Sequence, residues 1–182
     1  MRKFAALMVF ASAVSCTSAP KNTDFAKKAF EAWAKAAVEG DAEKTLEGHT
    51  DANLCDWIYN RLEENDGLAT RWRTGLTGRA RTDLDLWWGV SRKHGNGRTE
   101  LLGASVLQHP SFRQLFRDHY LQALSEVKAT FSKLEITQSW GDDSGVTLVV
   151  KLNGGVYMMY GMAFERSTWK IDTLKEGTGQ GN

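Results

Sequence analysis

The stretch that decides the fold is residues 134–175, which read LEITQSWGDDSGVTLVVKLNGGVYMMYGMAFERSTWKIDTLK. Three short breaks divide it into four apolar runs: residues 141–145 (GDDSG), 153–155 (NGG) and 165–167 (ERS). Glycine takes positive φ at no steric cost, so the first two breaks favour reversal of the chain. The runs hold Val, Ile, Thr, Tyr, Phe and Trp, which suit a pleated, half-buried surface. The pattern predicts a four-stranded antiparallel meander, covered by the helical and irregular chain upstream.

The start of the chain is typical of an export signal. Residues 1–3 are basic, and the largely apolar run that follows is too short to span a bilayer core. It leads to residues 13–16 (AVSC), which resemble the lipobox of bacterial lipoproteins. The resemblance implies that residues 1–15 are a signal peptide and that a lipid on Cys16 anchors the mature chain in the bacterial cell envelope, on the periplasmic or extracellular side. The alternative is cleavage after Ala19, although proline is a poor residue directly after the cut.

Positive and negative charges nearly cancel. The 182 residues include 23 Lys and Arg against 22 Asp and Glu, and loss of Arg2 and Lys3 with the signal peptide turns a formal charge of +1 into −1. A nearly neutral protein has no global field to attract nucleic acid, so no nucleic-acid partner is expected. Cys55 remains as a single thiol, which we expect to be structural and half-buried rather than reactive. The expected layout is a tether over residues 16–23, a single domain over residues 24–175 and a disordered tail over residues 176–182.

Helices are predicted upstream of the sheet. Apolar residues recur at helical spacing over residues 25–37, 54–62 and 112–131. Thr23 and Asp51 are the predicted caps of the first two of these helices, and Asp41 caps a short helix between them. The longest helix begins at Pro110 or Ser111 and has a wide apolar face suited to lying on a sheet.

Residues 65–100 are predicted to form an irregular insertion rich in arginine and tryptophan. Within it, residues 82–88 (TDLDLWW) alternate like a strand, yet they also suit the start of a helix that reaches Ser91. Interleaved arginine and tryptophan bind anions and stacked rings, so an envelope polymer, an anionic lipid headgroup or an envelope protein is a candidate partner. The alternative, which we favour, is a solvated loop whose tryptophans fold back on the core. The candidate surface residues are Arg71, Trp72, Arg73, Arg79, Arg81, Trp87 and Trp88.

This order of elements resembles the nuclear transport factor 2-like (SnoaL-like) superfamily of cone-shaped α+β domains. The matching points are Trp33 in the first helix, the turn at Gly40 and Asp41, and the last strand, STWKID. The resemblance extends over residues 25–174. It implies an α+β fold in which N-terminal helices and one long helix pack on a curved antiparallel sheet of about four strands. The family usually has one or two further short strands between the helices, for which residues 82–88 are the candidate.

The resemblance also implies a pocket between sheet and helices. The candidate lining residues are Trp33, His119, Met158, Tyr160, Met162 and Trp169. Methionine, aromatic and histidine side chains suit an apolar small molecule. The favoured alternative is a filled core in which a carbonyl group satisfies His119.

No catalytic residue, metal site or cofactor is predicted. Enzymes of the superfamily use an Asp, His or Tyr in the pocket, with a pKa moved toward neutrality. Here Asp172 alternates away from the pocket, and His119 has no acid–base partner on its helix face. The four histidines lack metal-ligand spacing.

The sequence therefore predicts an envelope-anchored, non-enzymatic binding or interaction module of unknown ligand. The alternative is a small pocket enzyme of the isomerase, dehydratase or cyclase type that the resemblance implies. Expected partners are the membrane through the N-terminal lipid, together with an envelope polymer, an apolar small molecule or an envelope protein. The resemblance also implies that the chain can form a homodimer through the outer face of the sheet, which carries Met159.

Overall fold

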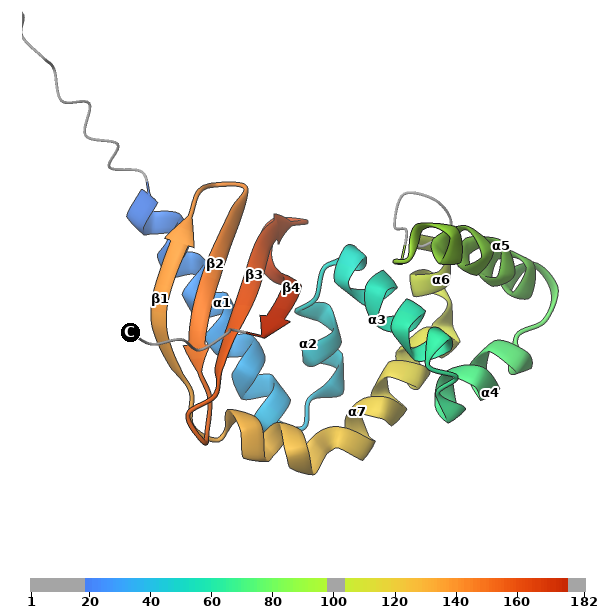
Figure 1. The fold of residues 1–182 in the computed structure, drawn as a ribbon, viewed down its shortest axis with the longest axis horizontal. Helices are drawn as coiled ribbons and strands as arrows, with labels where there is room; N and C mark the ends of the chain where they lie inside the picture. Colours follow the sequence, from blue (N-terminus) through green and yellow to red (C-terminus); the bar gives the residue numbers. More distant parts are fainter. Residues whose placement is uncertain (1–18, 98–103, 177–182) are drawn as a thin grey trace, which may run out of the picture.

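The computed structural model describes residues 19–97 and 104–176. The predicted signal peptide, Cys16 and residues 177–182 of the predicted tail lie outside these ranges. Within them the chain forms seven helices and a four-stranded antiparallel sheet, which confirms the predicted α+β class. Figure 1 shows the sheet with the first helix as one lobe and a group of shorter helices as a second lobe beside it.

The sheet follows the predicted meander. Its strands, joined in sequence order and each antiparallel to the next, are β1 (Glu135–Gly141), β2 (Gly145–Lys151), β3 (Tyr157–Glu165) and β4 (Thr168–Glu176). All three predicted breaks are hairpin turns. Gly154 and Gly155 take φ values of 86° and 83° in the second turn, as a tight reversal requires. β4 extends to Glu176, one residue into the predicted tail.

One face of the sheet is covered by α1 (Ala19–Glu39), as Figure 1 shows. Phe30 is fully buried at the centre of this contact. The buried residues of this sheet cluster are Ala26, Phe30, Val146, Leu148, Val150, Leu152, Tyr160, Met162 and Ile171. The helix already begins at Ala19, so the predicted tether is wrong from that residue onward, and so is the cap at Thr23. Proline is tolerated in a first helical turn, and Pro20 therefore allows the earlier start.

A second hydrophobic core lies among the remaining helices. Most of its residues come from α3 (Asp51–Glu63), α4 (Gly67–Gly75), α5 (Gly78–His94), α6 (Ala104–Gln108) and α7 (Pro110–Phe131). The buried residues of this helical cluster include Leu54, Cys55, Ile58, Leu62, Leu84, Trp87, Phe112, Leu115 and Phe116. Cys55 is 0% exposed, more deeply buried than expected. The helices upstream of the sheet thus divide between covering it and building a core of their own.

The predicted irregular insertion over residues 65–100 is wrong, because most of its described part is helical. Asp66 caps α4 by accepting backbone hydrogen bonds from Leu68 and Ala69, at 2.9 and 3.0 Å. Gly95 closes α5 in the left-handed conformation, with φ of 72°. Ordinary capping signals therefore delimit two helices in a stretch whose glycines suggested a loop.

In α5 the choice between strand and helix is decided by burial. Leu84, Trp87 and Ser91 are 0% exposed and recur at helical spacing. A strand would place Leu84 and Leu86 on one face, yet Leu86 is 57% exposed. The helix alternative for residues 82–88 is therefore confirmed.

The two clusters are joined by α7. It begins at Pro110, as predicted, with His109 as its N-cap. Phe116 near its start is buried in the helical cluster, whereas Phe131 at its end packs against the sheet cluster. Along its length it contacts α1, α4, α6 and α2 (Ala42–Glu47), the short helix that Asp41 caps as predicted. The long helix thus reaches the sheet through α1 and its own last turn, rather than by lying across it.

The chain between α2 and α3 runs beside the outer edge of β4. Thr50 N donates to Ile171 O at 2.9 Å, and Ile171 N donates to Gly48 O at 2.8 Å. Thr50 is also the N-cap of α3, because its extended backbone lets its hydroxyl accept from Asn53 N at 3.1 Å. The predicted cap at Asp51 is therefore wrong by one residue. This bridge ties the helical lobe directly to the sheet.

Candidate functional site: an interlobe cleft

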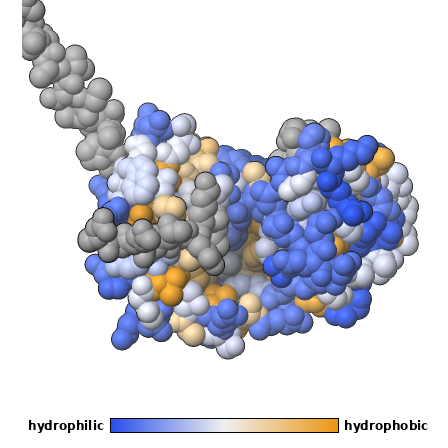
Figure 2. All heavy atoms as spheres, viewed as in Figure 1, coloured by the Kyte–Doolittle hydropathy of each residue, from blue (hydrophilic) through white to orange (hydrophobic). Residues whose placement is uncertain are grey.

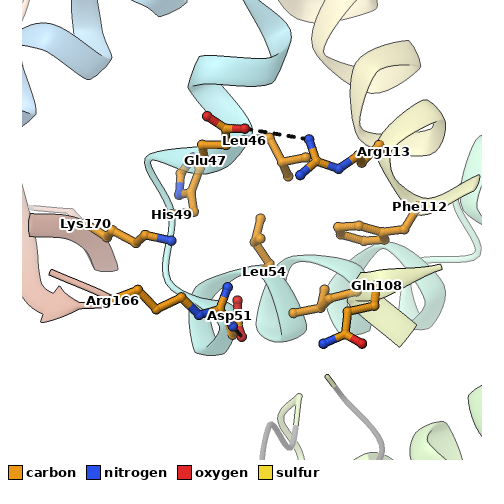
Figure 3. Close-up of a pocket in the computed structure, with 11 residues that line it drawn as sticks. Leu46, Glu47, His49, Asp51, Leu54, Gln108, Phe112, Arg113, Arg166 and Lys170 are labelled. Atoms are coloured by element: carbon orange, nitrogen blue, oxygen red, sulfur yellow. Dashed lines mark hydrogen bonds and ion pairs between the residues drawn. The ribbon is translucent and has the colours of Figure 1, made fainter. Parts of the chain in front are cut away.

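A cleft of about 280 Å³ lies where the two lobes meet. Its walls come from α2, α3, α6, α7 and the β3–β4 hairpin (Figure 3). The lining residues are Leu46, Glu47, His49, Asp51, Leu54, Leu107, Gln108, Phe112, Arg113, Arg166 and Lys170. Leu46, Leu54 and Phe112 belong to the buried helical cluster, so the lining combines an apolar surface with charged groups.

Three cationic side chains reach the cleft from separate elements. Arg113 projects from α7, Arg166 from the β3–β4 turn and Lys170 from β4 (Figure 3). Arg113 Nη1 lies 3.8 Å from Glu47 Oε1, and Arg166 forms an ion pair with Asp51. Three basic and two acidic side chains therefore line one cavity, and both signs of charge are held in place by their neighbours.

The turn that presents Arg166 has an uncommon backbone. Arg166 and Ser167 have φ values of 52° and 68°, the geometry of a two-residue hairpin turn that glycine or asparagine normally occupies. Each non-glycine residue there costs about 1–2 kcal/mol. Strand pairing continues up to Glu165 and Thr168, which fixes the turn despite this cost. Strain of this kind is concentrated at functional sites.

His49 is the histidine of the cleft. Its ring lies edge-on to Trp33, with 5.6 Å between ring centroids, and 6.3 Å from the ring of Phe116. Burial lowers the pKa of His49 to about 4, and Lys170 acts in the same direction, whereas the Asn53 side chain favours the protonated form. The imidazole is therefore neutral near pH 7.

Five of the six predicted pocket residues lie together in or against the sheet cluster. They are Trp33, Met158, Tyr160, Met162 and Trp169. The ring centroid of Phe30 is 5.6 Å from that of Trp33 and 4.7 Å from that of Tyr160. These rings pack against one another between α1 and the sheet, where the candidate pocket was placed and a filled core was the favoured alternative.

His119, the sixth predicted pocket residue, lies in the helical cluster. Its ring centroid is 5.2 Å from that of Trp57, and its Nε2 is 3.0 Å from Asp66 Oδ1. Burial lowers the pKa of His119, against the opposing effect of Asp66. The position of His119 on α7 therefore directs its ring toward Trp57 of α3 and the carboxylate of Asp66, which caps α4. The ring does not lie beside Trp33.

The three tryptophans of the predicted arginine–tryptophan surface pack inward. Trp87 is fully buried, and Trp72 Nε1 donates to Ser111 Oγ at 2.8 Å. Trp88 is partly buried beneath Arg73, whose Cζ is 4.0 Å from the ring centre. These rings therefore stabilise the second lobe.

The four arginines of that surface divide into two pairs. Arg73 Nη2 lies 2.9 Å from Asp85 Oδ1, and Arg81 Nε lies 2.6 Å from Asp85 Oδ2. Burial opposes ionisation of Asp85, but hydrogen bonds from Arg81 and Arg73 hold its pKa below the ordinary value. Arg71 and Arg79 are exposed. Of the seven candidate surface residues, two are thus fully exposed and the other five are at least partly buried.

The charged residues of the cleft are not among the sites predicted from sequence. Arg113, Arg166, Lys170, Asp51 and His49 come from separate elements, and tertiary packing alone brings them together. One local signal was present. A tight hairpin turn without glycine requires a left-handed backbone at Arg166 and Ser167, which marks a strained turn.

No family model, curated protein or solved structure matches this chain. Its fold and site define it as an α+β protein with a charged interlobe cleft. None of the described helices is long and apolar enough to cross a membrane. Among residues 19–97 and 104–176, no three His, Cys, Asp or Glu side chains are grouped to hold a metal ion.

Proposed function

We propose that the chain is an envelope-anchored, non-enzymatic binding domain whose interlobe cleft holds a small zwitterionic ligand with an apolar group. The observation that carries this proposal is the lining itself, in which Arg113, Arg166 and Lys170 share one cavity with Glu47 and Asp51. Basic side chains bind a carboxylate, and acidic side chains bind an ammonium group. The apolar part of the lining suits the remainder of such a molecule.

The size of the cleft favours a small ligand. Its volume of about 280 Å³ is just below the range of typical small-molecule sites, which span roughly 300–1,000 Å³. A free amino acid or a short peptide has both charges and an apolar side chain within such a volume.

The existing ion pairs do not close the site to a ligand. The side chain of Arg166 is 64% exposed in its pair with Asp51, whose own side chain is 22% exposed, so the pair is open to solvent on the arginine side. Exposed ion pairs contribute only about 0–1 kcal/mol to stability. A ligand carboxylate offers Arg166 two parallel hydrogen bonds in exchange, so the change of partner costs little.

The histidine of the cleft supports binding over catalysis. General acid–base catalysis is most efficient when the pKa of the catalytic group is near the working pH. Burial moves the pKa of His49 down to about 4, which leaves the imidazole neutral and a weak base. The alternative of a small pocket enzyme requires a proton-transfer group better matched to neutral pH.

The anchor and the family resemblance belong to the same proposal. The basic start, the apolar run and the AVSC sequence support lipidation of Cys16. A long first helix on an antiparallel sheet and the turn at Gly40 and Asp41 support the cone-type family. The helices in place of short strands over residues 67–94 depart from it.

Lipidation is tested by labelling cells with a fatty acid. We expect the label on the wild-type chain and its loss in Cys16→Ser, with the variant released from the membrane fraction. A wild-type chain that takes up no label contradicts the anchor and leaves the cleft proposal intact.

Ligand binding is tested by NMR chemical-shift perturbation with the dipeptide Leu-Phe as the probe. We expect shifts at cleft residues, and roughly tenfold weaker binding when the probe is N-acetylated or C-amidated, because each charge-assisted hydrogen bond contributes about 1.5 kcal/mol or more. Arg166→Gln should weaken binding by a similar factor. The matched control is Arg79→Gln, because the Arg79 side chain is 93% exposed and outside the cleft. A probe that shifts no cleft residue at millimolar concentration rules out the zwitterion proposal.

A further inference from the structure

A second cleft lies at the end of the sheet lobe where α1 begins. It encloses about 570 Å³ and is lined by Asn22, Phe25, Asp143, Phe164, Ser167, Thr168 and Trp169. Figure 1 shows why these residues meet, because the start of α1, the β1–β2 turn and the β3–β4 turn all lie at the same end of the lobe. We call it the aromatic cleft.

The aromatic cleft lies where the sheet face that α1 buries opens to solvent. Along β3, Tyr160, Met162 and Phe164 alternate onto one face, and the first two are 4% and 2% exposed. Phe164 follows on the same face and is 54% exposed. It pairs across the strands with Trp169, with 5.6 Å between their ring centroids. The apolar face of β3 therefore runs from the buried sheet cluster to a solvent-exposed ring at its end.

A third ring completes this surface from the helix side. Phe25 on α1 lines the same cleft and is 58% exposed. Exposed apolar patches built from large residues mark interaction sites more often than chance exposure of single side chains does. Figure 2 shows polar and apolar residues mixed over the sheet lobe, whereas the second lobe is mostly hydrophilic on this side.

We propose that the aromatic cleft docks on the lipid–water interface of a membrane, with Phe25, Phe164 and Trp169 inserted at headgroup level. The position of the anchor selects this occupant. Cys16 precedes Asn22 of the cleft by six residues, the last four of which belong to α1. Even a fully extended segment of that length spans at most roughly 20 Å. An anchored chain therefore keeps these rings beside the bilayer. Trp is suited to that boundary because its ring is apolar and its N–H is polar, and Phe supplies apolar area that inserts beside it.

Charge does not explain the attraction, which distinguishes this surface from a basic lipid-binding patch. Asp143 lines the cleft and Asp142 lies in the same turn. Lys27, one turn along α1, lies 3.9 Å from Asp24. We therefore expect docking on zwitterionic lipid that is insensitive to salt, since screening acts on exposed charges.

The inference rests on the anchoring part of the proposed function, and its test separates the two. The mature chain, residues 16–182, contains every described element and is coupled through the Cys16 thiol to a maleimide lipid in phosphatidylcholine vesicles. This supplies the tether whether or not cells lipidate the chain, and Cys55 is too buried to compete. Brominated phosphatidylcholine then quenches the fluorescence of tryptophans that reach the interface. The difference in quenching between the wild type and Trp169→Phe gives the contribution of Trp169.

We expect the quenched share of Trp169 to fall at least twofold in the double variant Phe25→Ser, Phe164→Ser, and to stay unchanged between low and high salt. The control is Leu121→Ser, which changes an equally exposed apolar residue on α7, at 48% exposure. Thermal melting checks that all variants fold. Quenching that is absent in the wild type, or equal in the double variant, overturns the docking surface while leaving native lipidation to be judged by the fatty-acid label.

Discussion

His49 should make the stability of this protein depend on pH in a way that one substitution removes. The pKa of His49 falls from an ordinary 6.5 to about 4 on folding, because burial disfavours the charged ring. The folded state therefore binds fewer protons than the unfolded state between these values. The part of the free energy of unfolding that depends on a neutral His49 is fully present above about pH 6.5, and it is lost as the pH falls toward about 4.

The size of the effect follows from the shift. At about pH 5 the His49 ring is protonated in the unfolded state and neutral in the folded state. The free energy of unfolding falls by about 1.4 kcal/mol for each pH unit below 6.5, so about 1.5 units lower it by about 2 kcal/mol. With a urea m-value of about 2 kcal/mol per molar, the denaturation midpoint should move down by about 1 M between pH 7.5 and pH 5 from this group alone.

The assay is urea denaturation at both pH values for the wild type and His49→Gln. Glutamine cannot titrate, so the variant should lose about 2 kcal/mol less stability than the wild type over the same interval. His119, whose pKa burial also lowers, titrates in both proteins and cancels in this comparison. Equal losses in the two proteins would refute the reasoning, since they would show that His49 has the same pKa folded and unfolded.

Two further predictions compare matched positions. Phe30→Ala removes a fully buried ring and should lower the free energy of unfolding by about 3–5 kcal/mol. Phe25 is 58% exposed, so Phe25→Ala should change it by about 0.5 kcal/mol or less. Similar melting temperatures for the two variants would contradict the sheet cluster. Gly97→Ala should destabilise by about 1–3 kcal/mol, because its Cβ would lie 2.2 Å from Cys55 O, whereas Gly75→Ala meets no atom within 4 Å and should stabilise α4 by about 0.5–1 kcal/mol. The opposite signs are read from urea midpoints, and a harmless Gly97→Ala would show that the chain there does not press on α3.

The sheet could be predicted because its signals are local. Each strand is bounded by a turn within a few residues, and the alternation of β2 and β3 appears directly in the sequence. Over residues 82–88 the choice between strand and helix stayed open, because Leu84, Leu86 and Trp88 alternate by chance within a helix whose buried side chains are Leu84, Trp87 and Ser91. Two periodicities fitted the same seven residues, and burial against the helical cluster decided between them.

The clefts could not be predicted for a different physical reason. Arg113 and Lys170 are far apart in sequence, and their meeting depends on where α7 places the second lobe. Whether the candidate pocket between α1 and the sheet is open or filled depended on side-chain volume, and the rings of Phe30, Trp33 and Tyr160 pack against one another there. Pattern alone shows which face is apolar, but it does not show whether that face is filled.

The bridge beside β4 also bears on self-association. An unpaired strand edge can add a strand from another molecule and start aggregation. Hydrogen bonds from Thr50 and to Gly48 occupy the edge of β4 at Ile171, so this route is blocked where the strand is most apolar. At the other edge, the pairing of β1 is interrupted by a bulge at Thr137, which makes a flat docking strand harder to form. A change that releases residues 48–50 from β4 would therefore expose an unpaired, aggregation-prone strand edge before the sheet itself unfolds.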